Sequence, residues 1–390
     1  MHARGCPVAV RRRRGRLVTF PFEALRRAPD VEGEGLVAAD AADRLILDTS
    51  AEARTAVGDG ELVVIGDAYG ALALGAAWDG CRGIRVHQDA LTGEQALARN
   101  AASLDLAGRV ASSPTLDADL VRGARVVLLR LPRSLDALRD IAGLIAAHAR
   151  PDVVVYAGGR LKHMTVAMNA VLGAFFTRVD VTHARQKSRV LVARGPHDGA
   201  DPMPAASRVD GLEIRAFGGA FGGAHLDIGT RLLLAHLPDS PGGGTEDDPL
   251  IDLACGTGVI GAHLALRHPS AFVWSSDQSA AAVASARATA RANGVEPRMQ
   301  VVRDDALSQW PDASASFVAL NPPFHSGAAV TDRIAPHLFA DAARVLRPGG
   351  ELWCVWNSPL RYRPVLERIV GPTRQVARDP KFTVTVSTRR

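Results

Sequence analysis

The sequence predicts an α/β protein made of two tandem, doubly wound domains. Three observations support this fold class. The chain has 390 residues, enough for two or three domains of about 150 residues each. Its 47% hydrophobic and 22% charged residues are typical of a globular chain that buries a core. Short apolar runs alternate with helical patterns in the C-terminal half, and the same alternation returns in the N-terminal half.

The C-terminal half alternates strands and helices in a regular order. We expect strands at residues 250–254, 272–276, 299–302, 317–321, 351–356 and 382–387, and helices at 258–267, 279–293 and 331–346. The strands are continuous apolar runs, such as Leu250–Ala254, and the second helix ends at a stop signal, Asn293-Gly294. Continuous apolar runs are typical of a mostly parallel sheet covered by helices on both faces.

The N-terminal half repeats this plan. Five of its segments match, in order, the strands that begin at residues 250, 272, 317, 351 and 382: residues 61–67, 83–89, 125–132, 152–159 and 184–194. The repeat is far longer than the roughly 20–50 residues of a solenoid repeat. A duplicated domain is the simplest explanation.

Composition along the chain predicts the domain boundaries. Residues 1–30 hold eight arginines against two acidic residues, and we expect a basic, disordered tail. It either tracks phosphates or is a plain disordered extension or an over-long predicted start. The two domains are expected at residues 31–195 and 211–390, joined by a linker at 196–210 that is rich in Gly, Pro, Asp and Ser. The remainder of the chain is nearly neutral, so charge alone does not predict a nucleic-acid binder.

Several classes of protein are excluded at this stage. The four cysteines lie far apart, which predicts neither a zinc site nor a disulfide framework, and we expect no metal. No signal peptide is evident, so a cytoplasmic location is expected. No apolar run approaches the roughly 18 residues needed to cross a bilayer, so we expect no membrane contact.

The glycine-rich stretch Asp252–Gly261 lies between a predicted strand and a predicted helix. Glycines there let a ligand approach the backbone, and a helix N-terminus offers free N–H groups. Taken alone, the glycine spacing and Asp277 also fit a dinucleotide fingerprint, hence an NAD-linked dehydrogenase, or a purely structural turn. Asp252 distinguishes these interpretations. Its carboxylate would repel the pyrophosphate of a dinucleotide, whereas it suits a cationic amino group.

A second motif, Asn321-Pro322-Pro323-Phe324, ends the fourth strand. The exocyclic amine of a purine is a poor nucleophile, because its lone pair is delocalised into the ring. The Asn321 side-chain oxygen and the Pro322 carbonyl can accept its N–H groups, and Phe324 offers a ring on which a base can stack. Together with the glycine loop, this motif indicates S-adenosylmethionine as methyl donor and an amine as acceptor, in a displacement that depends mainly on alignment.

The C-terminal half resembles class I, Rossmann-like S-adenosylmethionine-dependent methyltransferases with an NPPF motif. The matching stretches are Leu226–Leu234, Ile251–Gly261, Asn321–His325 followed by Thr331-Asp332, and Gly349–Asn357. The whole of residues 30–390 is similar to the tandem-domain bacterial ribosomal RNA methyltransferases that modify the 2-amino group of guanine. The similarity is closer to the large-subunit enzyme than to the small-subunit one.

The resemblance implies a role for each matching residue. Asp252, Ala254, Gly256 and Gly258 would surround the methionine part of the cofactor, Asp277 would bind its ribose and Asp305 its adenine amino group. Asn321, Pro322 and Phe324 would handle the target base, with Asn321 also near the cofactor. Ala254 stands where the family usually has glycine.

The N-terminal copy departs from the same pattern. Its loop Asp67-Ala68-Tyr69-Gly70 has one glycine where several are expected, and Arg130-Leu131-Pro132-Arg133 replaces the NPPF motif. We therefore expect a degenerate, inactive copy, which the family uses for substrate recognition.

Some features leave alternatives open. Leu226–Gly229 either lines the cofactor mouth or forms a plain helix-entry turn. A set of basic residues in the N-terminal half is either a phosphate track or scattered solvated charge: Arg160, Lys162, Arg185, Lys187 and Arg189. The expected enzyme is a monomer that acts on naked or partly assembled ribosomal RNA with an unstacked target base. The alternatives are a methyltransferase for an adenine 6-amino group or a protein glutamine amide, and a non-catalytic RNA-binding protein.

Overall fold

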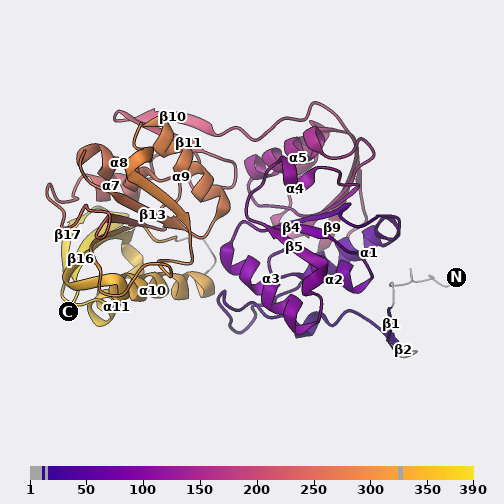
Figure 1. Cartoon of the computed structure of the whole chain (residues 1–390), viewed down its shortest axis with the longest axis horizontal. Coiled ribbons are helices and arrows are strands. Elements are labelled where there is room, and N and C mark those ends of the chain that lie inside the picture. Colours follow the sequence, from indigo (N-terminus) through magenta and orange to yellow (C-terminus); the bar gives the residue numbers. More distant parts are fainter. Residues whose placement is uncertain (1–10, 14–15, 324–327) are drawn as a thin grey trace. The chain divides into compact units, whose positions relative to one another are not determined.

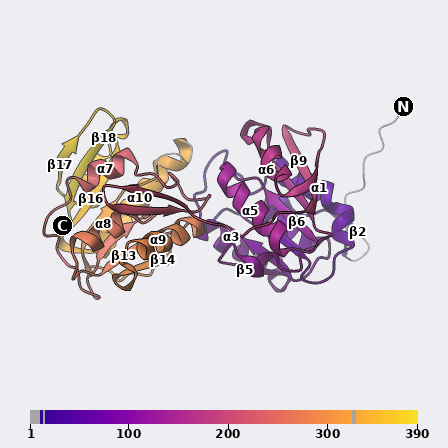
Figure 2. The same ribbon diagram turned by 90° about the horizontal axis from the view of Figure 1, so that it is seen from above.

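The computed structural model of the chain describes residues 11–13, 16–323 and 328–390. The chain divides into two compact units, Met1–Met203 and Pro204–Arg390, which we call the N-terminal and C-terminal units. Each unit contains one seven-stranded sheet with helices on both faces (Figures 1 and 2). The predicted pair of doubly wound α/β domains is confirmed.

The N-terminal unit begins with a short antiparallel pair, β1 (Arg11–Arg13) and β2 (Arg16–Val18). Its seven-stranded sheet runs, in spatial order, β5 (Val110–Ser113), β4 (Ile84–His87), β3 (Leu62–Ile65), β6 (Val126–Arg130), β7 (Val154–Arg160), β9 (Ser188–Pro196) and β8 (Phe176–Val181). The helices are α1 (Ala41–Thr55), α2 (Ala71–Trp78), α3 (Leu91–Ser103), α4 (Ala118–Val121), α5 (Leu135–His148) and α6 (Ala167–Gly173).

The C-terminal unit has the same plan. Its sheet runs β14 (Met299–Arg303), β13 (Val273–Asp277), β12 (Leu250–Leu253), β15 (Ala315–Leu320), β16 (Leu346–Asn357), β18 (Phe382–Thr388) and β17 (Thr373–Arg378). The helices are α7 (Ile228–Leu234), α8 (Val259–Arg267), α9 (Ala280–Ala292), α10 (Ala328–Val345) and α11 (Arg363–Ile369), and a hairpin of β10 (Ala205–Val209) and β11 (Leu212–Ala216) precedes them.

The two sheets share one topology. In each, five strands are parallel, and the last two along the chain add in antiparallel fashion at one edge. All five segment pairs that the sequence repeat predicted occupy equivalent strands, namely β3 and β12, β4 and β13, β6 and β15, β7 and β16, and β9 and β18. The duplication inferred from the sequence therefore extends to strand order.

Each sheet separates two hydrophobic cores. In the C-terminal unit, one core packs under α7, α8 and α9 and the other under α10 and α11. Neighbouring residues of one strand contribute to opposite cores, as Leu250 and Ile251 do in β12. In the N-terminal unit, α1, α2 and α3 cover one core and α4, α5 and α6 the other. Burial on both faces explains why the strands read as continuous apolar runs.

The β10–β11 hairpin differs from the sequence expectation. The predicted linker at residues 196–210 includes all of β10, and β9 also reaches Pro196. The two strands are joined by Asp210-Gly211, both with positive φ (52° and 85°), which is the two-residue turn that favours a hairpin. The apolar pattern was missed because β10 is largely exposed, and only β11 buries side chains, among them Leu212 and Ile214.

The expected disordered tail at residues 1–30 also differs from the structure. Phe20 and Leu25 are buried in the core under α1 and α2. The backbone of Arg26 is held by Asn100 of α3, which accepts from the Arg26 N–H (3.0 Å) and donates to its carbonyl oxygen (2.8 Å). Residues 20–30 therefore belong to the fold, and the isolated apolar side chains among arginines hid this from the sequence.

The same contact recurs in the C-terminal unit. Asn293, at the end of α9, accepts from the N–H of Glu213 in β11 (3.0 Å) and donates to its carbonyl oxygen (2.7 Å). An asparagine near the end of the helix, within the last turn of α3 and directly after α9, thus holds the backbone of an earlier segment in both units.

Among the described residues, no helix combines the length and the apolar character needed to cross a membrane.

Close packing of α1 on the sheet generates a stability prediction. A Cβ on Gly158 of β7 would clash with Cγ1 of the buried Ile46 and lie 2.8 Å from its Cδ1. We expect Gly158→Ala to destabilise the N-terminal unit by about 1–3 kcal/mol, which lowers its melting temperature by about 2–4 °C per kcal/mol. Gly173→Ala is the control, because nothing lies within 4 Å of its added Cβ. Calorimetry of the full chain checks this, and equal melting temperatures for the two variants would contradict it.

Candidate active site

The loop between β12 and α8 depends on two glycines in left-handed conformations. Gly256 has φ +54° and Gly258 has φ +75°, a region that L side chains rarely adopt. A Cβ on Gly258 would lie 2.7 Å from the Cβ of Ala286 in α9, so this glycine permits helix packing. Among the described residues, no atom lies within 4 Å of a Cβ built on Gly256. Gly256 therefore faces open space, where a ligand can approach the backbone.

Ala254, in the same loop, also has a positive φ, +56°. A non-glycine residue in this conformation costs roughly 1 kcal/mol, because its Cβ crowds the neighbouring carbonyl oxygen. The resemblance led us to expect glycine at this position, and the backbone conformation supplies the physical reason for that preference. The chain tolerates alanine here at the expense of local strain.

Asp252 is a buried carboxylate at the end of β12. Its Oδ2 accepts a hydrogen bond from the Gly261 N–H of α8 (2.8 Å), whereas its Oδ1 has no hydrogen-bond partner among the described residues. Burial raises the pKa of Asp252 to about 7. A buried carboxylate with one unpartnered oxygen fits a cationic amino group, such as that of a methionine moiety.

Asp277, at the end of β13, connects the glycine loop to the next helix. Its Oδ2 accepts from the Gly256 N–H (3.0 Å) and its Oδ1 accepts from the Ser279 N–H at the start of α9 (2.9 Å). A carboxylate oxygen can accept from more than one donor, which is the chemistry that ribose hydroxyls require. The side chain is half-buried beside the loop, which suits that role.

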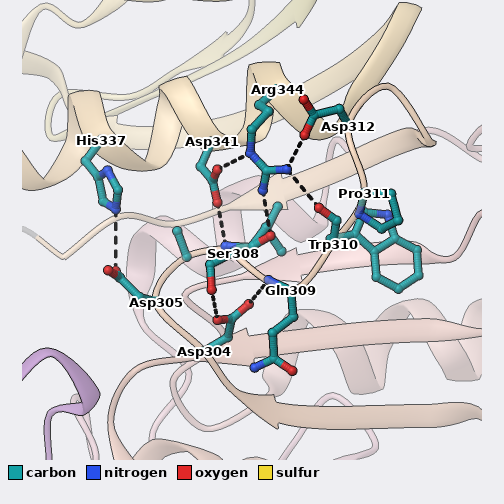
Figure 3. A network of polar contacts seen from close by, with 12 residues as sticks. Asp304, Asp305, Ser308, Gln309, Trp310, Pro311, Asp312, His337, Asp341 and Arg344 are labelled. Atoms are coloured by element: carbon teal, nitrogen blue, oxygen red, sulfur yellow. Dashed lines mark hydrogen bonds and ion pairs between the residues drawn. The ribbon is translucent and has the colours of Figure 1, made fainter. Parts of the chain in front are cut away.

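Asp305 lies in the loop that follows β14, opposite His337 of α10 (Figure 3). The two side chains are 3.4 Å apart between Oδ1 and Nε2, and this hydrogen bond raises the pKa of His337. Asp305 is partly exposed (27%), so it is accessible to an adenine amino group. His337 would be the neighbour of that group, a residue that the sequence reasoning did not identify.

The Asp305 loop is fixed by a polar network that Figure 3 shows between the loop and α10. Asp341 accepts from the Leu307 N–H (2.7 Å), and Arg344 donates to the carbonyl oxygens of Leu307 (2.7 Å) and Trp310 (2.8 Å). Within the loop, Asp304 accepts from the Gln309 N–H (3.0 Å). These bonds satisfy the backbone of an irregular segment and hold Asp305 in place.

Asn321 follows β15, and its amide orientation is defined by α7. Its Nδ2 donates to Oγ1 of Thr230 (2.8 Å) and to Oδ2 of Asp227 (3.2 Å). Its buried Oδ1 has no partner among the described residues. Because Thr230 and Asp227 both accept from the NH2 group of Asn321, the amide oxygen is the end that can accept from a ligand. Asp227 also caps α7 by accepting from the Thr230 N–H (3.0 Å).

Asp227 and Thr230 are the main additions to the predicted site. The sequence left open whether Leu226–Gly229 lined the cofactor mouth or formed a helix-entry turn. The structure shows that Asp227 is both the N-cap of α7 and a hydrogen-bond partner of Asn321. The stretch Asp227 to Thr230 is a sequence signal for an N-cap, but nothing in it points to a contact 94 residues away.

The remaining predicted residues of the tetrapeptide are described only in part. Pro322 is buried directly after Asn321. Phe324 lies outside the described residues.

The N-terminal copy has closed its own loop. The buried Asp67 accepts hydrogen bonds from the N–H groups of Leu72 (3.1 Å) and Ala73 (2.7 Å) in α2, and burial raises its pKa to about 6. Gln88 donates to the carbonyl oxygen of Ala68 (3.1 Å). Side chains of the unit thus bind the loop backbone directly, which agrees with a degenerate copy.

Both halves of the chain match known protein families. Residues 211–386 match the Methyltransferase small domain family, and residues 18–197 match the RLMG N-terminal domain family. The ribosomal RNA large subunit methyltransferase G of Streptomyces avermitilis is 35% identical over 379 residues, covering 93% of this chain and 95% of the relative. The protein of the same name from Shewanella amazonensis is 32% identical over 368 residues, with 92% and 94% covered. This chain belongs to the ribosomal RNA large subunit methyltransferase G family.

The fold is shared with a solved structure, the T. thermophilus 16S rRNA N2 methyltransferase RsmC in complex with AdoMet and guanosine. That structure superposes with a TM-score of 0.69 at 20% sequence identity, and the match covers 90% of this chain and 92% of that one. The likeness supports the tandem fold.

Family membership confirms the resemblance that the motifs predicted, including the preference for the large-subunit enzyme. It makes the chain an S-adenosylmethionine-dependent methyltransferase. The NAD-linked dehydrogenase that the glycine spacing alone left open is excluded. The half-satisfied Asp252, the open space beside Gly256 and the position of the Asp277 carboxylate beside the glycine loop all fit the methyl donor.

Burial of Asp252 generates a prediction for the pH dependence of stability. Its folded pKa, about 7, lies above the value of 3.8 for an unperturbed aspartate. The folded chain therefore holds this proton more tightly, so the stabilisation is fully present below pH 4 and is lost as the pH rises to about 7. We expect Asp252→Asn, which resembles the protonated form, to remove this part of the pH dependence.

Melting temperatures of the full chain between about pH 4 and pH 8 provide the measurement. Asp67→Asn is the matched control, because Asp67 titrates with the same sign in the N-terminal unit and its substitution leaves the Asp252 contribution intact. An Asp252→Asn profile parallel to that of the wild type would show that Asp252 does not titrate in this range.

Proposed function

We propose that the protein transfers a methyl group from S-adenosylmethionine to the exocyclic 2-amino group of a guanine in large-subunit ribosomal RNA. The observation that carries the proposal is the amide of Asn321. Its NH2 end is held by Thr230 and Asp227, and its oxygen has no hydrogen-bond partner among the residues that the structure describes. This arrangement offers a fixed acceptor to an N–H donor. An aromatic amine is such a donor. The family of this chain is named for ribosomal RNA methyltransferases, so we take the amine to belong to a base of that RNA.

The acceptor residues act on the target amine by hydrogen bonding. Asn321 Oδ1 accepts one N–H of the amine, and the Pro322 carbonyl, which follows directly in the chain, accepts the other. These bonds localise electron density on the nitrogen and aim its lone pair away from the acceptors. Phe324 provides the stacking surface for the base, which contributes about 1–3 kcal/mol. The proton lost from the amine leaves to solvent, so no strong base is needed.

The cofactor-binding residues are assigned by the same geometry. When bound, S-adenosylmethionine supplies an electrophilic methyl group on a sulfonium sulfur. Asp252 receives the amino group of its methionine part, with Ala254, Gly256 and Gly258 shaping the loop. Asp277 binds the ribose hydroxyls, and Asp305 binds the adenine amino group. Each assignment rests on an oxygen or an open space described above.

The proposal gives the two units different tasks. The C-terminal unit carries the chemistry. The N-terminal unit recognises the RNA, since the Asp67 carboxylate of its loop is bound by α2 and its acceptor position holds Arg130. The target base must leave its stack to reach Asn321, which favours naked or partly assembled RNA as the substrate. We take the active form to be a monomer.

Transfer to RNA tests the proposal directly. The purified protein is incubated with S-adenosylmethionine and large-subunit ribosomal RNA, and the nucleosides are identified by mass spectrometry. We expect N2-methylguanosine, and Asn321→Ala should lower its formation by at least about 100-fold because the acceptor for the amine is lost. Calorimetry with S-adenosylhomocysteine should show that the variant still binds cofactor. A methylated adenine, a methylated glutamine or no product would contradict the proposal.

The contact between Asn321 and α7 generates a second prediction. Thr230→Val keeps the side-chain shape but removes the hydroxyl that accepts from Asn321, so the amide loses its shorter anchor. We expect kcat to fall by roughly tenfold, the equivalent of about 1.4 kcal/mol, with little change in KM for RNA or in cofactor affinity. Thr230→Ser retains the hydroxyl and is the control, expected to stay within about twofold of the wild type. Equal kcat values for the two variants would show that Thr230 does not position Asn321.

A further inference from the structure

A cavity of about 310 Å³ in the N-terminal unit has four cationic side chains in its lining. Three of them are Arg130 at the end of β6, Arg160 at the end of β7, and Lys162 two residues later. Arg133 and His163 complete the basic lining, and Asp40 supplies its single carboxylate. The cavity lies at the lower end of the size range of ligand pockets, about 300–1,000 Å³.

This cavity occupies the position that the acceptor motif has in the C-terminal unit. Leu129 of β6 pairs with Ile65 of β3, and Leu320 of β15 pairs with Leu253 of β12, so Arg130 and Asn321 are equivalent residues. Both are held by the first turn of the helix that precedes the sheet. Asn321 binds Asp227 and Thr230 of α7, and Arg130 binds a matching pair in α1, the N-cap Asp40 (3.0 Å) and Asp43.

The chemistry at this position is reversed between the two units. Asn321 turns its NH2 inward and offers an oxygen, which accepts hydrogen bonds. Arg130 offers only donors, and its charge is compensated by Asp40 and Asp43. The charge of Arg130 is therefore compensated within the fold, and the other residues of the lining decide the charge of the cavity.

Those surrounding residues leave an excess of positive charge. Among the described residues, Arg133, Arg160 and Lys162 form no ion pair, and the Nε of Arg160 is buried without a hydrogen-bond partner. Their proximity is seen at His163, whose pKa is lowered by burial and then by the nearby charges of Arg133 and Lys162. Cations gathered in this way repel one another unless an anion joins them.

We propose that this cavity binds a backbone phosphate of the RNA substrate, so that the former acceptor site of the N-terminal unit serves as an anchor for the strand. A phosphate supplies the oxygen acceptors that Arg160, Arg133 and Lys162 lack. Apart from His163, the lining offers no ring on which a base can stack, which favours the backbone over a free nucleotide. The inference rests on the proposed function, because it takes RNA as the substrate.

Binding of RNA by the full chain tests the inference separately from methyl transfer. The probe is a fluorescently labelled fragment of large-subunit ribosomal RNA, titrated by anisotropy at several salt concentrations between about 50 and 200 mM. The pocket variant is Arg133→Ala/Lys162→Ala. The matched control is Arg82→Ala/Arg99→Ala, which removes the same charge from two exposed arginines of the same unit that do not line the cavity.

We expect the pocket variant to bind RNA about tenfold more weakly and the slope of log K against log salt to decrease by about one for each phosphate that the protein no longer neutralises. In turnover assays the weaker binding should appear in KM for RNA and not in kcat. The control should stay within about twofold of the wild type. Lys162→Arg in place of Lys162→Ala should restore part of the affinity, because the charge returns.

Three outcomes would overturn the inference. Unchanged RNA affinity in the pocket variant would show that the cavity does not contact the strand. An equal loss in the control would assign the effect to the overall charge of the unit. Guanosine monophosphate or inorganic phosphate that binds the wild type but not the pocket variant, without competing with RNA, would identify a small-anion site instead. If the wild type binds RNA through the pocket but transfers no methyl group, the proposed function fails and the anchor stands.

Discussion

The site depends on which end of one amide is available. Asn321 can present either an oxygen or an NH2 group, and the hydrogen bonds to Thr230 and Asp227 decide in favour of the oxygen. The proposed activity follows from that choice, because an exposed NH2 would repel the donor groups of an amine. The same Asp227 caps α7, so the start of this helix and the orientation of the catalytic amide are stabilised by one side chain. Fold and chemistry are therefore coupled at the junction of α7 and β15.

The N-terminal unit keeps the contact between the start of a helix and the end of a strand, but makes it with different residues. In the N-terminal unit the first turn of α1 still binds the residue at the end of the fourth sheet strand, but carboxylates now hold a guanidinium. Removing Arg130 would leave the buried Asp43 carboxylate without its cationic partner. The surrounding cations then give the old acceptor position a new preference, for oxygen-rich ligands. The same arrangement of helix and strand thus presents a hydrogen-bond acceptor in one unit and hydrogen-bond donors in the other.

Much of the fold could be predicted because its signals are local. Continuous apolar runs such as Leu250–Ala254 identified the strands, and the internal repeat identified the second sheet. The hairpin at β10–β11 was missed, although Asp210-Gly211 is a local turn signal, because the flanking residues are largely exposed. Residues 20–30 were assigned to a tail because the arginines obscured Phe20 and Leu25. The partners of Asn321 could not be predicted, since that contact joins residues 94 positions apart.

The carboxylate of Asp67 in the N-terminal loop has a thermodynamic consequence. Both of its oxygens accept hydrogen bonds from the first turn of α2, whereas Asp252 in the other unit has one oxygen without a partner among the described residues, which suits the methyl donor. Ligand binding stabilises a folded state by an amount that grows with the logarithm of ligand concentration. If the C-terminal unit binds the methyl donor as proposed, its free energy of unfolding increases with the donor concentration. The free energy of unfolding of the N-terminal unit does not depend on that concentration. At a low donor concentration the N-terminal unit would therefore remain folded and able to bind RNA.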